Sequence, residues 1–145
     1  MDLADLYQEI IIDHNRSPRN FRVLADATHS AEGFNPLCGD RLTLYLKIAD
    51  GRIQDAAFQG NGCAISVASA SLMTDGVKGR TEQEARAMFD RFHALVTTED
   101  AGDAGLGKLA ALGGVRAYPS RVKCAVLCWH ALAAALKGEH GATTE

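Results

Sequence analysis

Residues 42–58, "LTLYLKIADGRIQDAAF", decide the fold of this chain. Over 42–48, leucine and isoleucine alternate with polar or aromatic side chains, which is the period of a strand with one buried face. The Asp50-Gly51 pair that follows favours a two-residue turn, and residues 53–58 can return as the partner strand. The stretch therefore predicts a β-hairpin that packs one face against a core.

The segment before the hairpin predicts a helix and a third strand. Apolar residues recur at helical spacing over 3–11, and Ser17-Pro18 ends that pattern. Residues 27–34 alternate only weakly between apolar and polar side chains. Because a lone hairpin is marginally stable, we expect this stretch to add a third antiparallel strand.

Two helices are predicted directly after the hairpin. Beyond Gly60-Asn61-Gly62, small and apolar residues predict a helix that runs to about Lys78. Residues 81–84, "TEQE", form a capping box. In such a box the threonine side chain accepts a hydrogen bond from an early backbone N–H of the helix, and the side chain of the last glutamate reaches back to the threonine. An apolar stripe continues from this box, so a third helix begins there.

The last third of the chain predicts one long helix and two less regular segments. Residues 97–117 are rich in Gly, Ala and acidic side chains with a short helical pattern, and we expect this segment to be mobile or variable. A helix begins near Pro119-Ser120 and ends at Gly138. Residues 139–145 are expected to form a flexible tail.

Composition narrows the classes of function. The chain has 145 residues, 47% hydrophobic and 23% charged, which predicts a single globular domain over 1–145 with an ordered core over about 1–138. Its net charge of -3 offers no excess of cations for phosphates, so we expect no nucleic-acid partner. The sequence has neither a signal peptide nor an apolar run of bilayer length, and we expect a cytoplasmic protein with no membrane partner.

The cysteines are the candidate functional residues. In a reducing compartment disulfides are disfavoured, which leaves metal binding or thiol chemistry. Cys38, Cys63 and Cys124 lie at the ends of predicted elements, where side chains can converge. With Asp40 they make a donor set that tetrahedral Zn²⁺ accepts. Because no paired C-x-x-C is present, a second interpretation stays open, in which the cysteines are unligated and partly buried.

Other candidate residues receive plainer interpretations. Cys128 follows Cys124 by four residues, and we interpret it as a small buried hydrophobe. The Gly60-Asn61-Gly62 turn lacks the lysine of a phosphate-binding loop, so we interpret it as a tight turn before Cys63. The five histidines show no pairing at ligand spacing and are assigned no role: His14, His29, His93, His130 and His140.

Three cysteine-bearing blocks carry a family resemblance. They read "LCGD", "GNGCAISVASASLMTDGVKG" and "RVKCAVLCWHAL", and "LYQEIIIDHNRSPRNF" near the N-terminus matches as well. Together they resemble the NifU N-terminal/IscU/SufU-like family of iron–sulfur cluster assembly proteins, over nearly the whole chain. The resemblance implies an α+β fold, consistent with a three-stranded antiparallel sheet packed by about five helices. It also implies a metal or cluster site at Cys38, Asp40, Cys63 and Cys124.

Two departures from the family pattern resemble its SufU branch. IscU-type scaffolds carry a histidine before the third cysteine, whereas Lys123 precedes Cys124 here. The interval between Cys63 and Cys124 is also longer, with 97–117 as an apparent insertion. The SufU branch implies a zinc-dependent sulfurtransferase, which takes persulfide sulfur from a SufS-type cysteine desulfurase and passes it to downstream SUF assembly components.

The resemblance also implies a role for each ligand. A histidine of the desulfurase would replace one thiolate on Zn²⁺, which frees Cys38 to accept sulfur while the other three residues stay ligands. We further expect the helix N-terminus, with Arg121 and Lys123 nearby, to favour the thiolate form of Cys124. Two alternatives stay open: a scaffold that assembles a [2Fe–2S] cluster or binds iron at the same residues, and a structural zinc protein that serves only as an interaction module.

Overall fold

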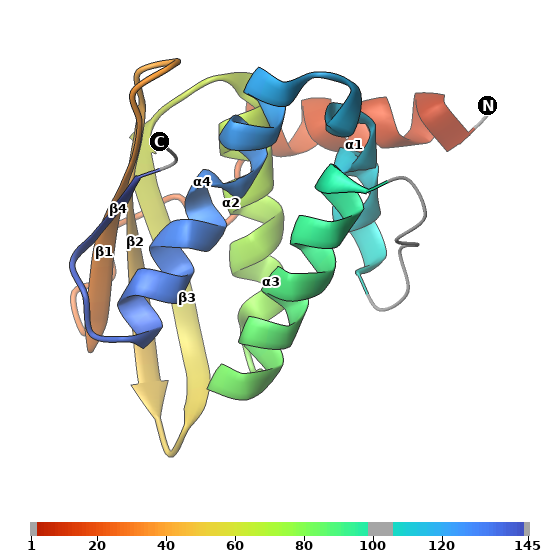
Figure 1. Cartoon of the computed structure of the whole chain (residues 1–145). Helices are drawn as coiled ribbons and strands as arrows, with labels where there is room; N and C mark the ends of the chain where they lie inside the picture. Colours follow the sequence, from red (N-terminus) through yellow and green to blue (C-terminus); the bar gives the residue numbers. More distant parts are fainter. Residues whose placement is uncertain (1–2, 99–105, 144–145) are drawn as a thin grey trace.

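The computed structural model describes residues 3–98 and 106–143, which form a sheet covered by helices. The elements in chain order are α1 (Leu3–Arg16), β1 (His29–Asn35), β2 (Asp40–Ala49), β3 (Arg52–Asn61), α2 (Ala64–Val77), α3 (Glu82–Thr97), the 3₁₀ helix η1 (Gly107–Ala117), α4 (Pro119–Leu136) and β4 (Gly141–Thr143). Figure 1 shows α4 and α2 stacked on one side of the sheet, with α3 outside them and α1 crossing near one end. The predicted α+β class with about five helices is confirmed.

The β-hairpin predicted from the opening stretch is β2 and β3. The two strands pair antiparallel with Ala49 opposite Arg52, and β1 adds the third antiparallel strand on the other side of β2. The residue at the tip, Asp50, has a φ of 56°, a left-handed value that two-residue hairpin turns of this kind require. Leu44 and Leu46 of β2 are fully buried, as the alternation predicts.

The sheet has a fourth strand that the sequence does not predict. The strand order is β3-β2-β1-β4, and β4 pairs parallel to β1 over residues 141–143. The expected three-stranded sheet and the expected flexible tail over 139–145 are therefore corrected for these three residues, while 144–145 lie outside the described part of the chain. The sequence does not predict β4 because three residues are too few to show the alternation of a strand.

The remaining helices begin and end close to their predicted boundaries. In α3 the capping box is present, since Glu84 N–H donates to the Thr81 hydroxyl at 3.1 Å and Thr81 N–H donates to the Glu84 carboxylate at 2.9 Å. The predicted first helix extends past residue 11 as α1, which ends at Arg16, just before Ser17-Pro18.

The segment expected to be mobile is largely a packed 3₁₀ helix. Leu109 and Leu112 of η1 are buried in the core, and Arg116 donates to the backbone oxygens of Leu95 and Thr98 at 3.0 Å each. The expectation of a mobile segment is therefore corrected for 107–117, while residues 99–105 lie outside the described ranges. Apolar burial and these two hydrogen bonds tie η1 to α3.

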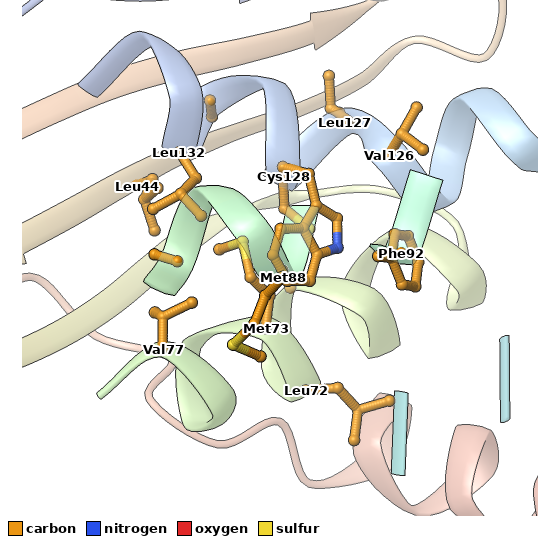
Figure 2. Packing of buried hydrophobic residues seen from close by; sticks show 14 of the residues in the cluster. Leu44, Leu72, Met73, Val77, Met88, Phe92, Val126, Leu127, Cys128 and Leu132 are labelled. Carbon is orange, nitrogen blue, oxygen red and sulfur yellow. The ribbon is translucent and has the colours of Figure 1, made fainter. Parts of the chain in front are cut away.

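The core lies between the sheet and the helices. Figure 2 shows Leu44 of β2 on one side of the cluster, with side chains of α4 and α2 beside it. Trp129 of α4 is fully buried against Phe89 and Phe92, whose rings stack on it with centroids 5.9 and 5.1 Å away. Cys128 belongs to this cluster, which confirms its interpretation as a buried hydrophobe.

Candidate metal centre

The three predicted cysteine ligands lie at one end of the sheet. Cys38 is in the loop between β1 and β2, Cys63 is the N-cap of α2, and Cys124 lies in the second turn of α4. Figure 1 shows that this loop and the first turns of α2 and α4 lie at the same end of the molecule. Antiparallel pairing accounts for this, because β3 ends beside the start of β2 and leads directly into α2.

Three of the four predicted ligands converge closely enough to share one ion. Three ligand atoms lie within 4.8 Å of one another: the sulfurs of Cys38 and Cys124 and a carboxylate oxygen of Asp40. The two sulfurs are 3.5 Å apart. Thiolates and carboxylates at such separations fit a small tetrahedral ion such as Zn²⁺.

Asp40 carries the clearest sign of a cation site. Its side chain is buried, with 3% of its surface exposed, and Oδ1 accepts the Cys63 backbone N–H at 2.9 Å. The other oxygen, Oδ2, is buried with no hydrogen-bond partner. A buried carboxylate oxygen without a partner is costly, so the donor set fits a bound cation.

Cys63 lies at the same site but outside the close set of three. It lines the same cavity, and its thiol and that of Cys38 both contribute to the raised pKa of Cys124. The bond from its backbone N–H to Asp40 joins the start of α2 to the start of β2. Its role as a fourth ligand stays a prediction.

Two glycines shape the backbone around these side chains. Gly39 has a φ of 74°, which turns the chain between Cys38 and Asp40 so that both side chains reach the centre. Gly60 has a φ of 151°, and a Cβ there would lie 2.2 Å from the Arg41 carbonyl oxygen. This close approach holds the end of β3 against the start of β2.

The pKa of Cys124 runs against the expectation from its helix position. Burial raises this pKa well above that of an ordinary thiol, and the neighbouring side chains of Cys63, Cys38 and Asp40 raise it further. The predicted preference for a thiolate is therefore wrong for the protein without metal, because the helix N-terminus and nearby cations do not offset burial. Metal binding at this residue would have to displace a proton.

The centre opens into a cavity of about 600 Å³. Ser120 and Arg121 of α4 line it together with the loop of Cys38 and the turn before Cys63. Cys38 is exposed, whereas Cys124 is buried. Two large apolar side chains are also strongly exposed: Leu37, which precedes Cys38, at 62%, and Tyr118, two residues before Ser120, at 63%. The accessible thiol therefore lies on a surface that a partner protein could cover.

One polar residue at the centre was missed by sequence reasoning. Asn35 is fully buried and donates from Nδ2 to the Cys124 sulfur at 3.8 Å. The only sequence signal is an asparagine at the end of a strand, three residues before Cys38, which is equally typical of an ordinary turn. Its partner lies far along the chain, so spacing cannot reveal the contact.

Among the residues given plainer interpretations, Asn61 and Gly62 of the turn before Cys63 line the cavity, whereas Cys128 lies in the core. None of the five histidines is among the residues of the described chain that line the cavity. His14 is buried and hydrogen-bonded to the Ser71 hydroxyl at 2.7 Å, and its pKa is lowered mainly by burial. Burial also raises the pKa of Cys128 to about 12, which makes this thiol unreactive.

No helix in the described part of the chain is both long enough and apolar enough to cross a lipid bilayer.

Comparison with known proteins gives a consistent set of relatives. The sequence model of one protein family, the NifU-like N-terminal domain, matches residues 6–138 of this chain. The chain is 40% identical to the zinc-dependent sulfurtransferase SufU of Bacillus subtilis (strain 168), over 97% of this chain and 95% of that protein. It is also 40% identical to the iron–sulfur cluster assembly scaffold protein IscU of Streptococcus pyogenes serotype M1, over 93% of this chain and 85% of that protein.

Solved structures agree with the sequence comparison. The crystal structure of FiSufU from Fervidobacterium islandicum AW-1, described as a scaffold protein for the SUF system, superposes with a TM-score of 0.85. It is 34% identical and covers 93% of this chain and 99% of its own. An N-terminal NifU-like protein of Brucella abortus superposes with a TM-score of 0.80 at 29% identity, covering 94% of this chain and 95% of its own.

Proposed function

Because the chain belongs to the family of NifU-like N-terminal domains, we propose that it is a zinc-dependent sulfurtransferase of iron–sulfur cluster assembly. In this role it accepts persulfide sulfur from a SufS-type cysteine desulfurase and passes it to downstream SUF assembly components in the cytoplasm. The support from comparison is the similarity to the B. subtilis SufU along nearly the full length of both chains.

A single structural observation carries the proposal. The sulfurs of Cys38 and Cys124 and a carboxylate oxygen of Asp40 lie within 4.8 Å of one another, and Asp40 Oδ2 is buried without a partner. We assign these three residues and Cys63 as the ligands of Zn²⁺. When bound, Zn²⁺ would hold the coordinated thiols in their thiolate form at neutral pH.

Cys38 is the proposed sulfur acceptor because it is the exposed thiol of the set. Its thiolate attacks the outer sulfur of the cysteine persulfide on the desulfurase. A new S–S bond forms at Cys38 while the S–S bond on the desulfurase breaks, and the electron pair leaves with the desulfurase thiolate. The step exchanges one persulfide for another, so it needs no external oxidant or reductant.

The surroundings of Cys38 suit a sulfur transfer between two proteins. The acceptor must approach a sulfur that is itself covalently bound to a protein, and the open cavity gives access from one side. The exposed side chains of Leu37, next to Cys38 in sequence, and Tyr118, two residues before Ser120, supply apolar area. We expect them to contact the desulfurase.

The second candidate is a scaffold that assembles and transfers a [2Fe–2S] cluster on the same four residues. It is favoured by the similarity to proteins named as IscU scaffolds, such as that of S. pyogenes, and by the shared donor set. Thiolates also bind iron–sulfur clusters, so the ligand types alone fit both candidates. Lys123, in the position where IscU-type scaffolds carry a histidine, favours the zinc-dependent carrier.

Metal analysis and a desulfurase assay on the same preparation distinguish the candidates. Elemental analysis of the freshly purified protein is expected to give about one zinc per chain. Alanine formation from cysteine by a SufS-type desulfurase is expected to rise when the protein is added. Iron with acid-labile sulfide and no stimulation would instead support the scaffold, and zinc without stimulation would support a purely structural metal site.

A further inference from the structure

Asn35 is a fully buried polar side chain that the sulfur-transfer step does not use. It is the last residue of β1 and pairs with Asp40, the first residue of β2. The loop that carries Cys38 lies between these two residues. A buried amide must find partners for its oxygen and its nitrogen, and the identity of these partners defines what the residue does.

The oxygen atoms of Asn35 hold the loop of Cys38. The backbone carbonyl accepts the Gly39 N–H at 2.8 Å, and the side-chain Oδ1 accepts the Leu37 N–H at 3.2 Å. Because a backbone N–H can only donate, the amide oxygen must face Leu37. This assigns the amide orientation and leaves the NH₂ group on the side of Cys124.

The amide nitrogen contacts a predicted metal ligand on another element. Nδ2 donates to the Cys124 sulfur at 3.8 Å, within the range of hydrogen bonds to sulfur. Cys124 belongs to α4 and is buried, so water has little access to its sulfur. One side chain thus joins the loop of Cys38 to the sulfur of Cys124.

We propose that Asn35 is a positioning residue of the metal centre, which acts through an N–H···S hydrogen bond to the Cys124 thiolate. The inference rests on the proposed function, since it assumes that Cys124 binds the metal. A neutral N–H donor stabilises the negative sulfur and fixes its direction without competing as a ligand. The two hydrogen bonds that its oxygens accept from Gly39 and Leu37 place the loop of Cys38 relative to that sulfur at the same time.

The first test is the variant Asn35→Asp, probed with Co²⁺ in place of Zn²⁺. The substitution keeps an oxygen for the Leu37 N–H but replaces the N–H donor at Cys124 with a second acceptor. We expect Co²⁺ affinity, measured by competition with a chelator, to fall about 10- to 100-fold. The thiolate-to-cobalt charge-transfer band should also shift, which a merely structural role of Asn35 would not cause.

Asn61→Asp is the matched control for added charge. Asn61 is exposed and lines the same cavity. Among the described residues, its side chain makes no hydrogen bond to a cysteine sulfur, unlike that of Asn35. It therefore places the same extra charge near the ion without removing an N–H···S bond. We expect a smaller change in Co²⁺ affinity than in Asn35→Asp, and an equal change would mean that charge alone acts.

The outcomes separate the inference from the function beneath it. If the unaltered protein shows no thiolate-to-cobalt band, or if Cys124→Ala leaves the band unchanged, the proposed metal centre fails. If the band depends on Cys124 but Asn35→Asp keeps the affinity and the spectrum, only the role of Asn35 fails. Should Asn35→Asp not fold, Asn35→Ala is measured in its place with the same expected losses.

Discussion

At the scale of single residues, two cysteines of this chain have opposite environments, although both are free thiols. Cys38 is exposed in a loop beside a cavity, and Cys128 is buried in the core with its pKa raised to about 12. Exposure and pKa decide whether a thiol can act as a nucleophile. The two residues therefore allow a direct test of which thiol carries the sulfur.

Cys38→Ala should abolish the stimulation of a SufS-type desulfurase while the thermal unfolding midpoint of the metal-free protein stays unchanged. Cys128→Ala should do the reverse, with stimulation retained and a loss of about 1 kcal/mol in the free energy of unfolding. The measurements are alanine formation and thermal unfolding on chelator-treated protein. Retained stimulation in Cys38→Ala would place the acceptor elsewhere.

Gly60→Ala tests the close approach at the end of β3. An added Cβ would lie 2.2 Å from the Arg41 carbonyl oxygen, at a φ of 151° that other residues rarely adopt. We expect a loss of about 2 kcal/mol or more in the free energy of unfolding by urea. Gly114→Ala is the control, because no atom lies within 4 Å of its added Cβ, and an equal loss there would contradict the explanation.

The sequence was informative for the site wherever the chemistry lies in the residue type. Cysteines at the ends of predicted elements pointed to convergence, and the structure brings Cys38, Asp40 and Cys124 together. It was uninformative for Asn35, whose role depends on a contact with Cys124 on a different element. The position of Cys63 in the ligand set stays a prediction.

At the scale of elements, the sequence pattern predicted the elements that are long enough to show one. The β2–β3 hairpin, α1 and α3 place their buried residues at regular spacing, and α2 and α4 are long runs of small and apolar residues that are buried on most sides, so all of them are long enough to recognise. The 3₁₀ helix η1 is Gly-rich with only a short helical pattern, and β4 has three residues, so neither is long enough to recognise in this way. Both are stabilised by contacts with other elements.

Leu112→Ala tests whether η1 is part of the core. The side chain is fully buried, so its truncation should lower the free energy of unfolding by about 2 to 5 kcal/mol. Lys108→Ala on the same helix changes an exposed side chain and should shift it by less than about 0.5 kcal/mol. Urea denaturation measures both, and equal small effects would mean that η1 contributes little to the core.

At the scale of the whole molecule, two histidines make stability depend on pH: His14, which is buried, and His130, which is half-buried. Burial, more than the nearby Arg19, lowers the pKa of His14 below its usual 6.5, and burial also lowers that of His130. The unfolded chain therefore binds protons that the folded chain does not accept at the same pH. The contribution of these histidines to stability is fully present above about pH 6.5, and it is lost as the pH falls from there toward their pKa values in the folded protein.

His14→Gln should make this loss of stability shallower. We expect the free energy of unfolding by urea to decrease between about pH 7 and pH 5 in the unaltered protein and to decrease less in the variant. Chelator in all samples removes any contribution of metal binding, which also depends on pH. Identical slopes for the two proteins would rule out His14 as a source of the pH dependence.

The parallel pairing of β4 with β1 has a practical consequence for purification. Because the two strands run in the same direction, the chain leaves β4 at the end of the sheet where β1 reaches Asn35 and the loop of Cys38. A polyhistidine tag joined after this strand would place imidazoles, which bind zinc readily, beside the thiols. An affinity tag placed before α1, or cleaved off, keeps the measured zinc a property of the protein itself.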